Sequence, residues 1–104
     1  MIISAGFDSA EGDPLGEIGV TPTGYAYMTW CLRNLCPKTA VILEGGYDLA
    51  ALERSSESVV RTLLLNPKDT AGFDNLISEL SGREGLTQQQ LETESLLDVR
   101  ESFK

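Results

Sequence analysis

The stretches IISAGFDSAEGD at residues 2–13 and AVILEGGYD at residues 40–48 decide the fold of this chain. Each is an apolar, strand-like run that ends in glycine, after which a reactive side chain follows: Asp8 in the first and Tyr47 in the second. Because both runs are almost continuously apolar, we expect strands that are covered on both faces, as in a parallel sheet. Ligands bind at the carboxyl ends of parallel strands, so the sequence predicts a site beside Asp8 and Tyr47.

Helical patterns alternate with these two runs. The predicted strands are residues 1–7 and 39–44. Thr21 is a good N-cap for a first helix that has Pro22 at its first position and ends at Pro37. Asp48 is expected to cap a second helix, which Asn66-Pro67 stops.

Apolar residues recur at helical spacing in both predicted helices. The expected core positions are Tyr25, Met28, Leu32 and Leu35 in the first helix and Leu49, Leu52, Val59, Val60, Leu63 and Leu64 in the second. The order strand, helix, strand, helix over residues 1–65 predicts an α/β fold with a parallel sheet and a right-handed crossover. Asp8 and Tyr47 would then emerge at the same edge of this sheet.

The chain changes character after the second helix. We divide it into residues 1–66, an α/β unit, and residues 67–104, a polar and partly helical C-terminal extension. Phe73, Leu76, Ile77 and Leu80 predict a short amphipathic helix. Thr87 and Gln90 have the spacing of a capping box and predict a last helix.

The composition excludes several classes of function. Eight basic and 16 acidic residues give a net charge of −8, which argues against direct nucleic-acid binding. No apolar run approaches the roughly 20 residues of a membrane span, and no basic segment precedes Met1's strand, so neither a membrane protein nor a secreted one is expected. Cys31 and Cys36 lie five apart and lack the C-x-x-C spacing of zinc or redox sites.

Each candidate side chain taken alone has more than one interpretation. Asp8 can be a metal ligand, a base or a loop cap, and Tyr47 can donate a hydrogen bond to an oxyanion or be a packed aromatic. Asp13, which precedes Pro14, is interpreted as a turn former. The glycines at residues 45–46 let a ligand approach the backbone closely, but the chain has no phosphate-binding loop of either common pattern.

Together the two runs are far more specific. S-A-G-F-D-x-A-x-G-D-P-L-G, followed by L-E-G-G-Y-D-L, closely resembles the zinc-dependent histone deacetylase and acetylpolyamine amidohydrolase family, and the class II histone deacetylases most. The resemblance covers roughly residues 1–65, including both predicted helices. It implies a three-layer αβα fold with a parallel sheet, the arginase/deacetylase-like fold, of which this chain carries the last β-α-β-α part and a helical tail.

The resemblance also implies roles for individual residues. Asp8 matches an aspartate ligand of the catalytic Zn²⁺, and Tyr47 matches the tyrosine that hydrogen-bonds the substrate carbonyl and stabilises the tetrahedral oxyanion. Gly45 and Gly46 match glycines beside the acetyl-lysine tunnel, and Leu15 matches an apolar residue at the tunnel mouth. The implied reaction is hydrolysis of the acetyl amide of N-acetyl-lysine, in which zinc polarises the carbonyl and activates a water.

One departure from the family affects function. The family takes its other zinc ligands from an Asp-x-His pair and its base from a His-His pair, whereas this chain has no histidine. A catalytic zinc needs about three protein ligands. We therefore expect zinc to act only in a complete domain, and we expect this chain alone to be inactive.

The resemblance leaves alternatives open. The chain is interpreted as the C-terminal part of a working lysine deacetylase; it could instead be a catalytically dead remnant that serves as an interaction module, a piece of an acetylpolyamine deacetylase, or an unrelated small α/β binding domain. The implied partners are acetylated lysines in histones or other proteins and corepressor-type proteins. The implied compartment is the nucleus, the cytoplasm or both.

Overall fold

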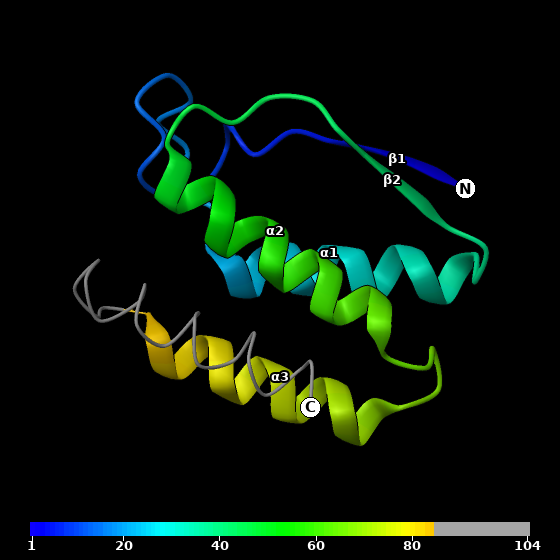
Figure 1. Ribbon diagram of the computed structural model, residues 1–104. Coiled ribbons are helices and arrows are strands. Elements are labelled where there is room, and N and C mark those ends of the chain that lie inside the picture. Colours follow the sequence, from blue (N-terminus) through cyan, green and yellow to red (C-terminus); the bar gives the residue numbers. More distant parts are fainter. Residues whose placement is uncertain (85–104) are drawn as a thin grey trace.

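The computed structural model describes residues 1–84 of the 104-residue chain and contains two strands and three helices (Figure 1). The elements in chain order are β1 (Ile2–Ala5), α1 (Pro22–Leu35), β2 (Ala40–Leu43), α2 (Leu49–Leu64) and α3 (Thr70–Arg83). The predicted α/β class is therefore confirmed, as is the alternation of strands and helices. The predicted last helix at Thr87 lies outside the described residues.

β1 and β2 pair directly and in parallel, with Ile2 opposite Ala40 and Ala5 opposite Leu43. Both strands are shorter than predicted. Beyond their last paired residues, single backbone hydrogen bonds still join the two segments. The Glu44 N–H donates to the Ala5 carbonyl at 2.8 Å, and the Phe7 N–H donates to the Gly45 carbonyl at 2.7 Å. The two segments after the strands therefore stay side by side up to the predicted site.

The helix boundaries follow the predicted capping chemistry. The Thr21 hydroxyl accepts a hydrogen bond from the Gly24 N–H, and the Asp48 carboxylate accepts from the N–H groups of Ala50 and Ala51. Each bond satisfies a donor that the first helical turn leaves unpaired. α1 ends two residues before Pro37, and α2 ends three residues before Pro67.

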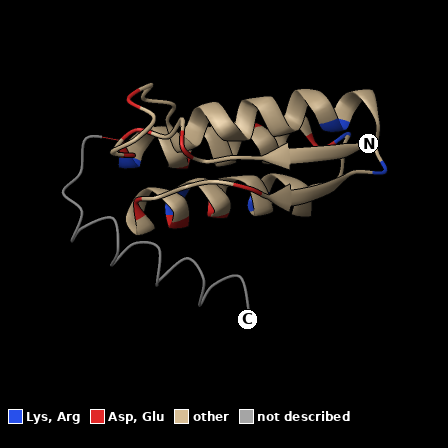
Figure 2. Cartoon of the chain, turned by 90° about the horizontal axis from the view of Figure 1, so that it is seen from above, with Lys and Arg blue, Asp and Glu red and all other residues tan. Residues whose placement is uncertain are grey.

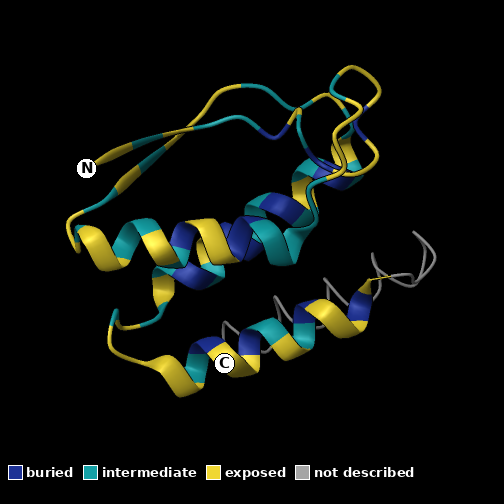
Figure 3. Cartoon of the chain, turned by 180° about the vertical axis from the view of Figure 1, so that it is seen from behind, coloured by how far each residue is buried: buried dark blue, intermediate teal, exposed yellow. Residues whose placement is uncertain are grey.

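α1 and α2 both lie on the same side of the sheet (Figure 1). Side chains alternate along a strand: Ala5 and Val41 pack on the core formed with these helices, whereas Ile2 is 73% exposed and Ile42 is 51% exposed. Within residues 1–84 the opposite sheet face carries no covering element, and each strand has one neighbour. Along both strands, every residue is exposed or half-buried (Figure 3).

The core positions of α1 and α2 confirm the predicted apolar stripes in part: Tyr25 and Val59 are buried, and Leu52 and Leu63 pack on the same core. Met28 and Leu35 in α1, and Leu49, Val60 and Leu64 in α2, are exposed. The buried positions are instead largely small: Ala26, Thr29, Ala51, Ser55, Ser58 and Thr62. The hydroxyls of Thr29, Ser58 and Thr62 donate to carbonyls of their own helix, as when Thr62 donates to the Ser58 carbonyl at 2.8 Å, so these buried polar groups are satisfied.

α3 packs against the side of α1 and α2 that faces away from the sheet (Figure 1). The predicted amphipathic pattern is confirmed, because Phe73, Leu76 and Leu80 are buried. Phe73 stacks on Trp30 of α1 with ring centroids 4.4 Å apart and lies edge-on to Tyr27. α3 therefore shares a second core with α1.

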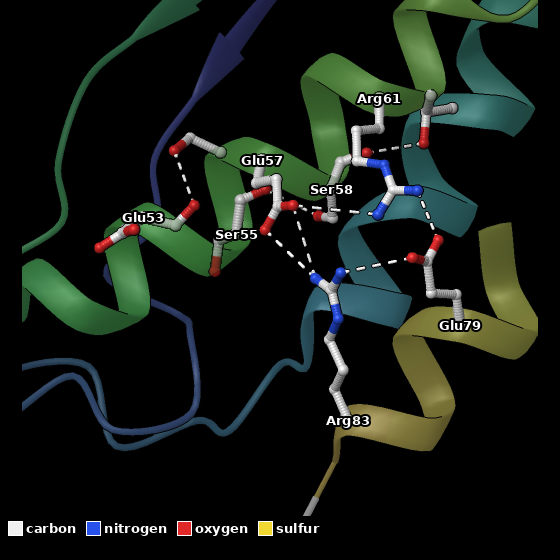
Figure 4. Close-up of polar contacts among 9 residues, drawn as sticks. Glu53, Ser55, Glu57, Ser58, Arg61, Glu79 and Arg83 are labelled. Carbon is white, nitrogen blue, oxygen red and sulfur yellow. Dashed lines mark hydrogen bonds and ion pairs between the residues drawn. The ribbon is translucent and has the colours of Figure 1, made fainter. Parts of the chain in front are cut away.

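Four charged side chains join α2 to α3 in an alternating ring (Figure 4). Arg83 of α3 contacts Glu57 of α2 at 3.4 Å and Glu79 at 3.4 Å, and Arg61 of α2 pairs with both carboxylates. Arg33 of α1 donates to the carbonyls of Thr62 and Leu65 at the C-terminal end of α2. The three helices are therefore held together by charged contacts as well as by apolar ones.

Candidate functional site

The carboxyl ends of β1 and β2 meet at one edge of the sheet, where the sequence places Asp8 and Tyr47. A Cβ atom built on Gly45 would lie 3.5 Å from the Asp8 carboxylate and 3.4 Å from the Tyr47 hydroxyl oxygen. The carboxylate and the hydroxyl therefore lie close to the same point beside Gly45. Asp8 is exposed, and Tyr47 is 59% exposed, so both side chains can reach a ligand outside the chain.

Gly46 occupies a position that other residues would strain. Its φ of +144° lies in a region that L-residues rarely adopt, and a Cβ atom would lie 3.0 Å from Leu52 and 3.3 Å from Phe7. The chain therefore turns tightly between the Gly45 carbonyl, which pairs with Phe7, and Tyr47. Glycine at this point lets Tyr47 begin close to the end of β1.

The loop between β1 and α1 is closed at its base and anchored to α1. The backbones of Ala10 and Val20 form a bridge, in which the Glu11 N–H donates to the Val20 carbonyl at 2.8 Å. The Ser9 hydroxyl shares a 2.6 Å hydrogen bond with the Tyr25 hydroxyl on α1. The loop is thus a compact structure that holds its tip against the site.

Leu15 lies at the tip of this loop with 71% of its surface exposed. Its backbone N–H donates to the Asp13 carboxylate at 2.8 Å. Asp13 forms the turn predicted from Asp-Pro, because the Gly16 N–H also donates to the same carboxylate oxygen, at 3.0 Å. All five predicted site residues therefore lie in the two segments that follow β1 and β2.

Asp13 also makes a contact that the sequence did not indicate. Its second carboxylate oxygen accepts a hydrogen bond from the backbone N–H of Tyr47, 34 residues away, at 2.8 Å. Burial alone would raise the pKa of the Asp13 carboxyl. The hydrogen bonds from the backbone N–H groups of Tyr47, Leu15 and Gly16 together lower it by more, so its pKa lies below the usual 3.8. In the sequence, Asp13 stands in a turn that contains glycine and proline, and this local pattern does not indicate a hydrogen bond to a distant residue.

The charge around the site is acidic. Glu11, Glu17, Glu44 and Asp48 accompany Asp8 in the segments near this edge, and residues 1–32 contain no Lys or Arg (Figure 2). Even so, no three His, Cys, Asp or Glu side chains within residues 1–84 are grouped so that they could hold a metal ion. The residues described here do not by themselves fit a catalytic zinc, which takes about three protein ligands.

The geometry defines an α/β protein with a candidate site at the carboxyl edge of a parallel sheet, and comparisons identify its family. The family model described as "Histone deacetylase domain" matches residues 1–63. The chain therefore belongs to the histone deacetylase domain family, as the two motifs predicted.

Individual relatives agree with this assignment. The chain is 55% identical over 65 residues to Histone deacetylase 15 of Arabidopsis thaliana. The matched segment covers 62% of this chain and 12% of that protein. It is 47% identical over 70 residues to Histone deacetylase HDA1 of Saccharomyces cerevisiae (66% and 10% covered) and 47% over 68 residues to Polyamine deacetylase HDAC10 of Danio rerio (64% and 10%). The chain thus spans only about a tenth of the length of the curated relatives it matches.

A solved structure shows the same fold. The crystal structure of the HDA15 HD domain resembles this chain with a TM-score of 0.60 and 37% sequence identity, covering 91% of this chain and 29% of that one. The predicted α/β deacetylase fold is therefore confirmed for a part of the domain. Within residues 1–84, no helix combines the length and apolar character needed to cross a membrane.

Proposed function

We propose that this chain supplies one wall of the active site of a lysine deacetylase, which hydrolyses the acetyl amide of N-acetyl-lysine. One observation carries the proposal: in a member of the deacetylase family, the Asp8 carboxylate and the Tyr47 hydroxyl lie on the same side of Gly45 at the carboxyl edge of the sheet. Tyr47 would be the catalytic residue of this wall, and Asp8 would be a metal ligand.

Tyr47 is suited to stabilise negative charge on the substrate. Its hydroxyl would donate a hydrogen bond to the acetyl carbonyl oxygen, which becomes an oxyanion when a nucleophile attacks the carbonyl carbon. Because Asp13 and the turn at Gly46 hold the Tyr47 backbone, the Tyr47 hydroxyl would already be oriented toward the acetyl carbonyl when the substrate binds.

The other predicted site residues would bind the substrate side chain. Gly45 and Gly46 would let the extended lysine chain pass close to the backbone, because they place no side chain beside Tyr47. Leu15, exposed at the loop tip, would contact the apolar stem of the lysine at the tunnel mouth.

The remaining parts of the site must come from elsewhere in a larger domain. The chain has no histidine, and its described residues include no grouping that could hold a metal. When bound in a complete domain, zinc would supply Lewis-acid activation of the carbonyl and of a water. We therefore expect this chain alone to be inactive.

The uncovered sheet face supports the same proposal. Ile2 and Ile42 are exposed on this face, and a two-stranded sheet with such an apolar face is typical of part of a larger sheet. Residues 1–66 would form part of the catalytic domain, and residues 67–104 would extend it, with α3 fixed on α1 and α2.

A second candidate is a catalytically dead deacetylase remnant that works as an interaction module. The absence of histidine favours it, and the exposed apolar face would be its binding surface. Acetylated histones, other acetylated proteins and acetylpolyamines are all candidate substrates of the working enzyme, because relatives named for histones and for polyamines both match this chain. Corepressor-type partners and a nuclear or cytoplasmic location are proposed from the family alone.

A chimera tests the proposed function. The 65-residue matching segment of the Arabidopsis relative is exchanged for that of this chain, and zinc-dependent release of acetate from an acetyl-lysine peptide is measured. We expect activity, its loss in Asp8→Asn, and a fall in kcat of about 10²–10³-fold in Tyr47→Phe. Tyr27→Phe, on an exposed tyrosine of α1, is the matched control. A folded chimera without activity, or an unchanged kcat in Tyr47→Phe, would refute the proposal.

A further inference from the structure

The Asp13 carboxylate connects the two segments of the candidate site. It is 5% exposed, and its two oxygens accept three backbone hydrogen bonds. Two of these, from Leu15 and Gly16, lie within its own loop. The third, from Tyr47, comes from the segment that follows β2. Within residues 1–84, the Asp13 carboxylate is the side-chain partner of the Tyr47 backbone N–H.

We propose that Asp13 is a positioning residue for this site, holding the backbone of Tyr47 and the loop that carries Leu15 and Asp8 in one fixed arrangement. The inference rests on the proposed roles of Tyr47 and Asp8. Asp13 itself touches no reacting atom. It acts through the backbone N–H of Tyr47 and through Gly16, which packs directly against the Asp8 carbonyl.

The hydrogen-bond pattern requires a carboxylate. All three partners are N–H donors, so both oxygens at this position must accept. An asparagine of the same shape presents one oxygen and one NH₂ group, and the NH₂ would face a donor on either the Leu15 and Gly16 side or the Tyr47 side. Asp13→Asn therefore keeps the volume of the side chain while breaking one of the two connections.

The charge of Asp13 is separable from that of its neighbours. The other carboxylates of this region are Asp8, Glu11, Glu17, Glu44 and Asp48, whereas the N–H groups of Leu15, Gly16 and Tyr47 donate to Asp13 and lower its pKa. An acid titration that follows the three amides therefore reports on Asp13.

The test uses amide signals of the full chain by NMR and needs no activity. In the wild type, the N–H resonances of Leu15, Gly16 and Tyr47 should move together on acidification, with one shared midpoint below 3.8. In Asp13→Asn this shared titration should vanish, and the Tyr47 amide should exchange with solvent about tenfold faster or more. Glu11→Gln, which removes an exposed carboxylate of the same loop, should leave the titration unchanged.

Two results would overturn the inference. One is a Tyr47 amide that does not titrate with those of Leu15 and Gly16 in the wild type, a measurement that holds even if the variant loses its loop structure. The other is unchanged Tyr47 exchange in a folded Asp13→Asn. The proposed function fails separately: an inactive chimera with three co-titrating amides would refute catalysis by this wall and leave the positioning intact.

Discussion

Replacing Gly16 with alanine should disturb the Asp8 side of the site more than any other single added methyl group. A Cβ atom on Gly16 would lie 1.6 Å from the Asp8 carbonyl oxygen and 2.7 Å from its carbon. Real Cβ contacts essentially never fall below 3.0 Å, so one backbone segment must move by more than an ångström. The obstacle is backbone rather than a flexible side chain, so it cannot rotate away.

The magnitude follows from this overlap. Gly16 is not among the residues with positive φ, so alanine brings no conformational strain and the cost comes from the contact alone. Inserting a methyl group where nothing can yield typically costs about 1–3 kcal/mol. Because the obstructing atoms are backbone, we expect the upper part, about 2–3 kcal/mol of unfolding free energy. If the unfolding free energy falls by less than this, the loop between β1 and α1 must have moved and displaced Asp8 with it.

Urea unfolding monitored by circular dichroism measures the cost, and amide NMR shifts of Asp8 and Ser9 measure the displacement. Gly82→Ala is the matched control, because a Cβ there meets nothing within 4 Å and alanine in α3 should raise stability by about 0.5–1 kcal/mol. The reasoning is refuted if Gly16→Ala unfolds at the wild-type urea concentration with unchanged shifts at Asp8.

Four further results are expected. Phe73→Ala should cost about 3–5 kcal/mol and shift the Trp30 fluorescence, because Phe73 is buried and stacked on that ring; unchanged emission would contradict the packing of α3. Arg83→Met should cost about 1–2 kcal/mol, less at high salt, because Arg83 pairs with Glu57 and Glu79; a cost independent of salt would argue against the ring. The folded-state pKa of Asp13 is lowered, so its stabilising contribution is present above pH 3.8 and is lost as the pH falls through the folded pKa; Asp13→Asn should flatten that loss in acid unfolding curves, and an unchanged curve would contradict it. Calorimetric titration of zinc into the chain alone should show no tight binding, and tight binding would contradict the proposal that its zinc-ligand set is incomplete.

The parts of the fold that local chemistry controls could be predicted from the sequence. Thr21 and Asp48 cap α1 and α2 through hydrogen bonds that span three residues or fewer, so the sequence contains both partners side by side. The parallel pairing followed from two apolar runs joined by a helix. The edge that brings Asp8 and Tyr47 together followed from that pairing.

Long-range contacts were not predictable in the same way. Asp13 was interpreted as a turn former, which is confirmed, but its bond to Tyr47 joins residues 34 apart and no local pattern specifies it. The core positions of α1 and α2 were predicted to be large apolar residues, which holds for Tyr25 and Val59, whereas small polar side chains such as Ser58 and Thr62 are buried as well. Hydrophobic periodicity does not detect a helix face that is buried through small residues, because serine and threonine count as polar in such a pattern.

The ring of charges between α2 and α3 was missed for a related reason. Glu57 and Glu79 are 22 positions apart and would each be read as solvated surface residues. Their partners Arg61 and Arg83 become apparent only when α3 has packed on α1 through Phe73. Tertiary packing thus creates an electrostatic contact that neither helix indicates alone.

The central claim is that Asp8 and Tyr47 form one wall of a deacetylase site whose other wall is encoded elsewhere in the same protein. Sequencing the transcript upstream of the Met1 codon tests it most directly. The account predicts an open frame that continues upstream and encodes a His-His pair and an Asp-x-His pair. A stop codon in frame just upstream of Met1 would contradict the claim and leave the chain as a non-catalytic interaction module.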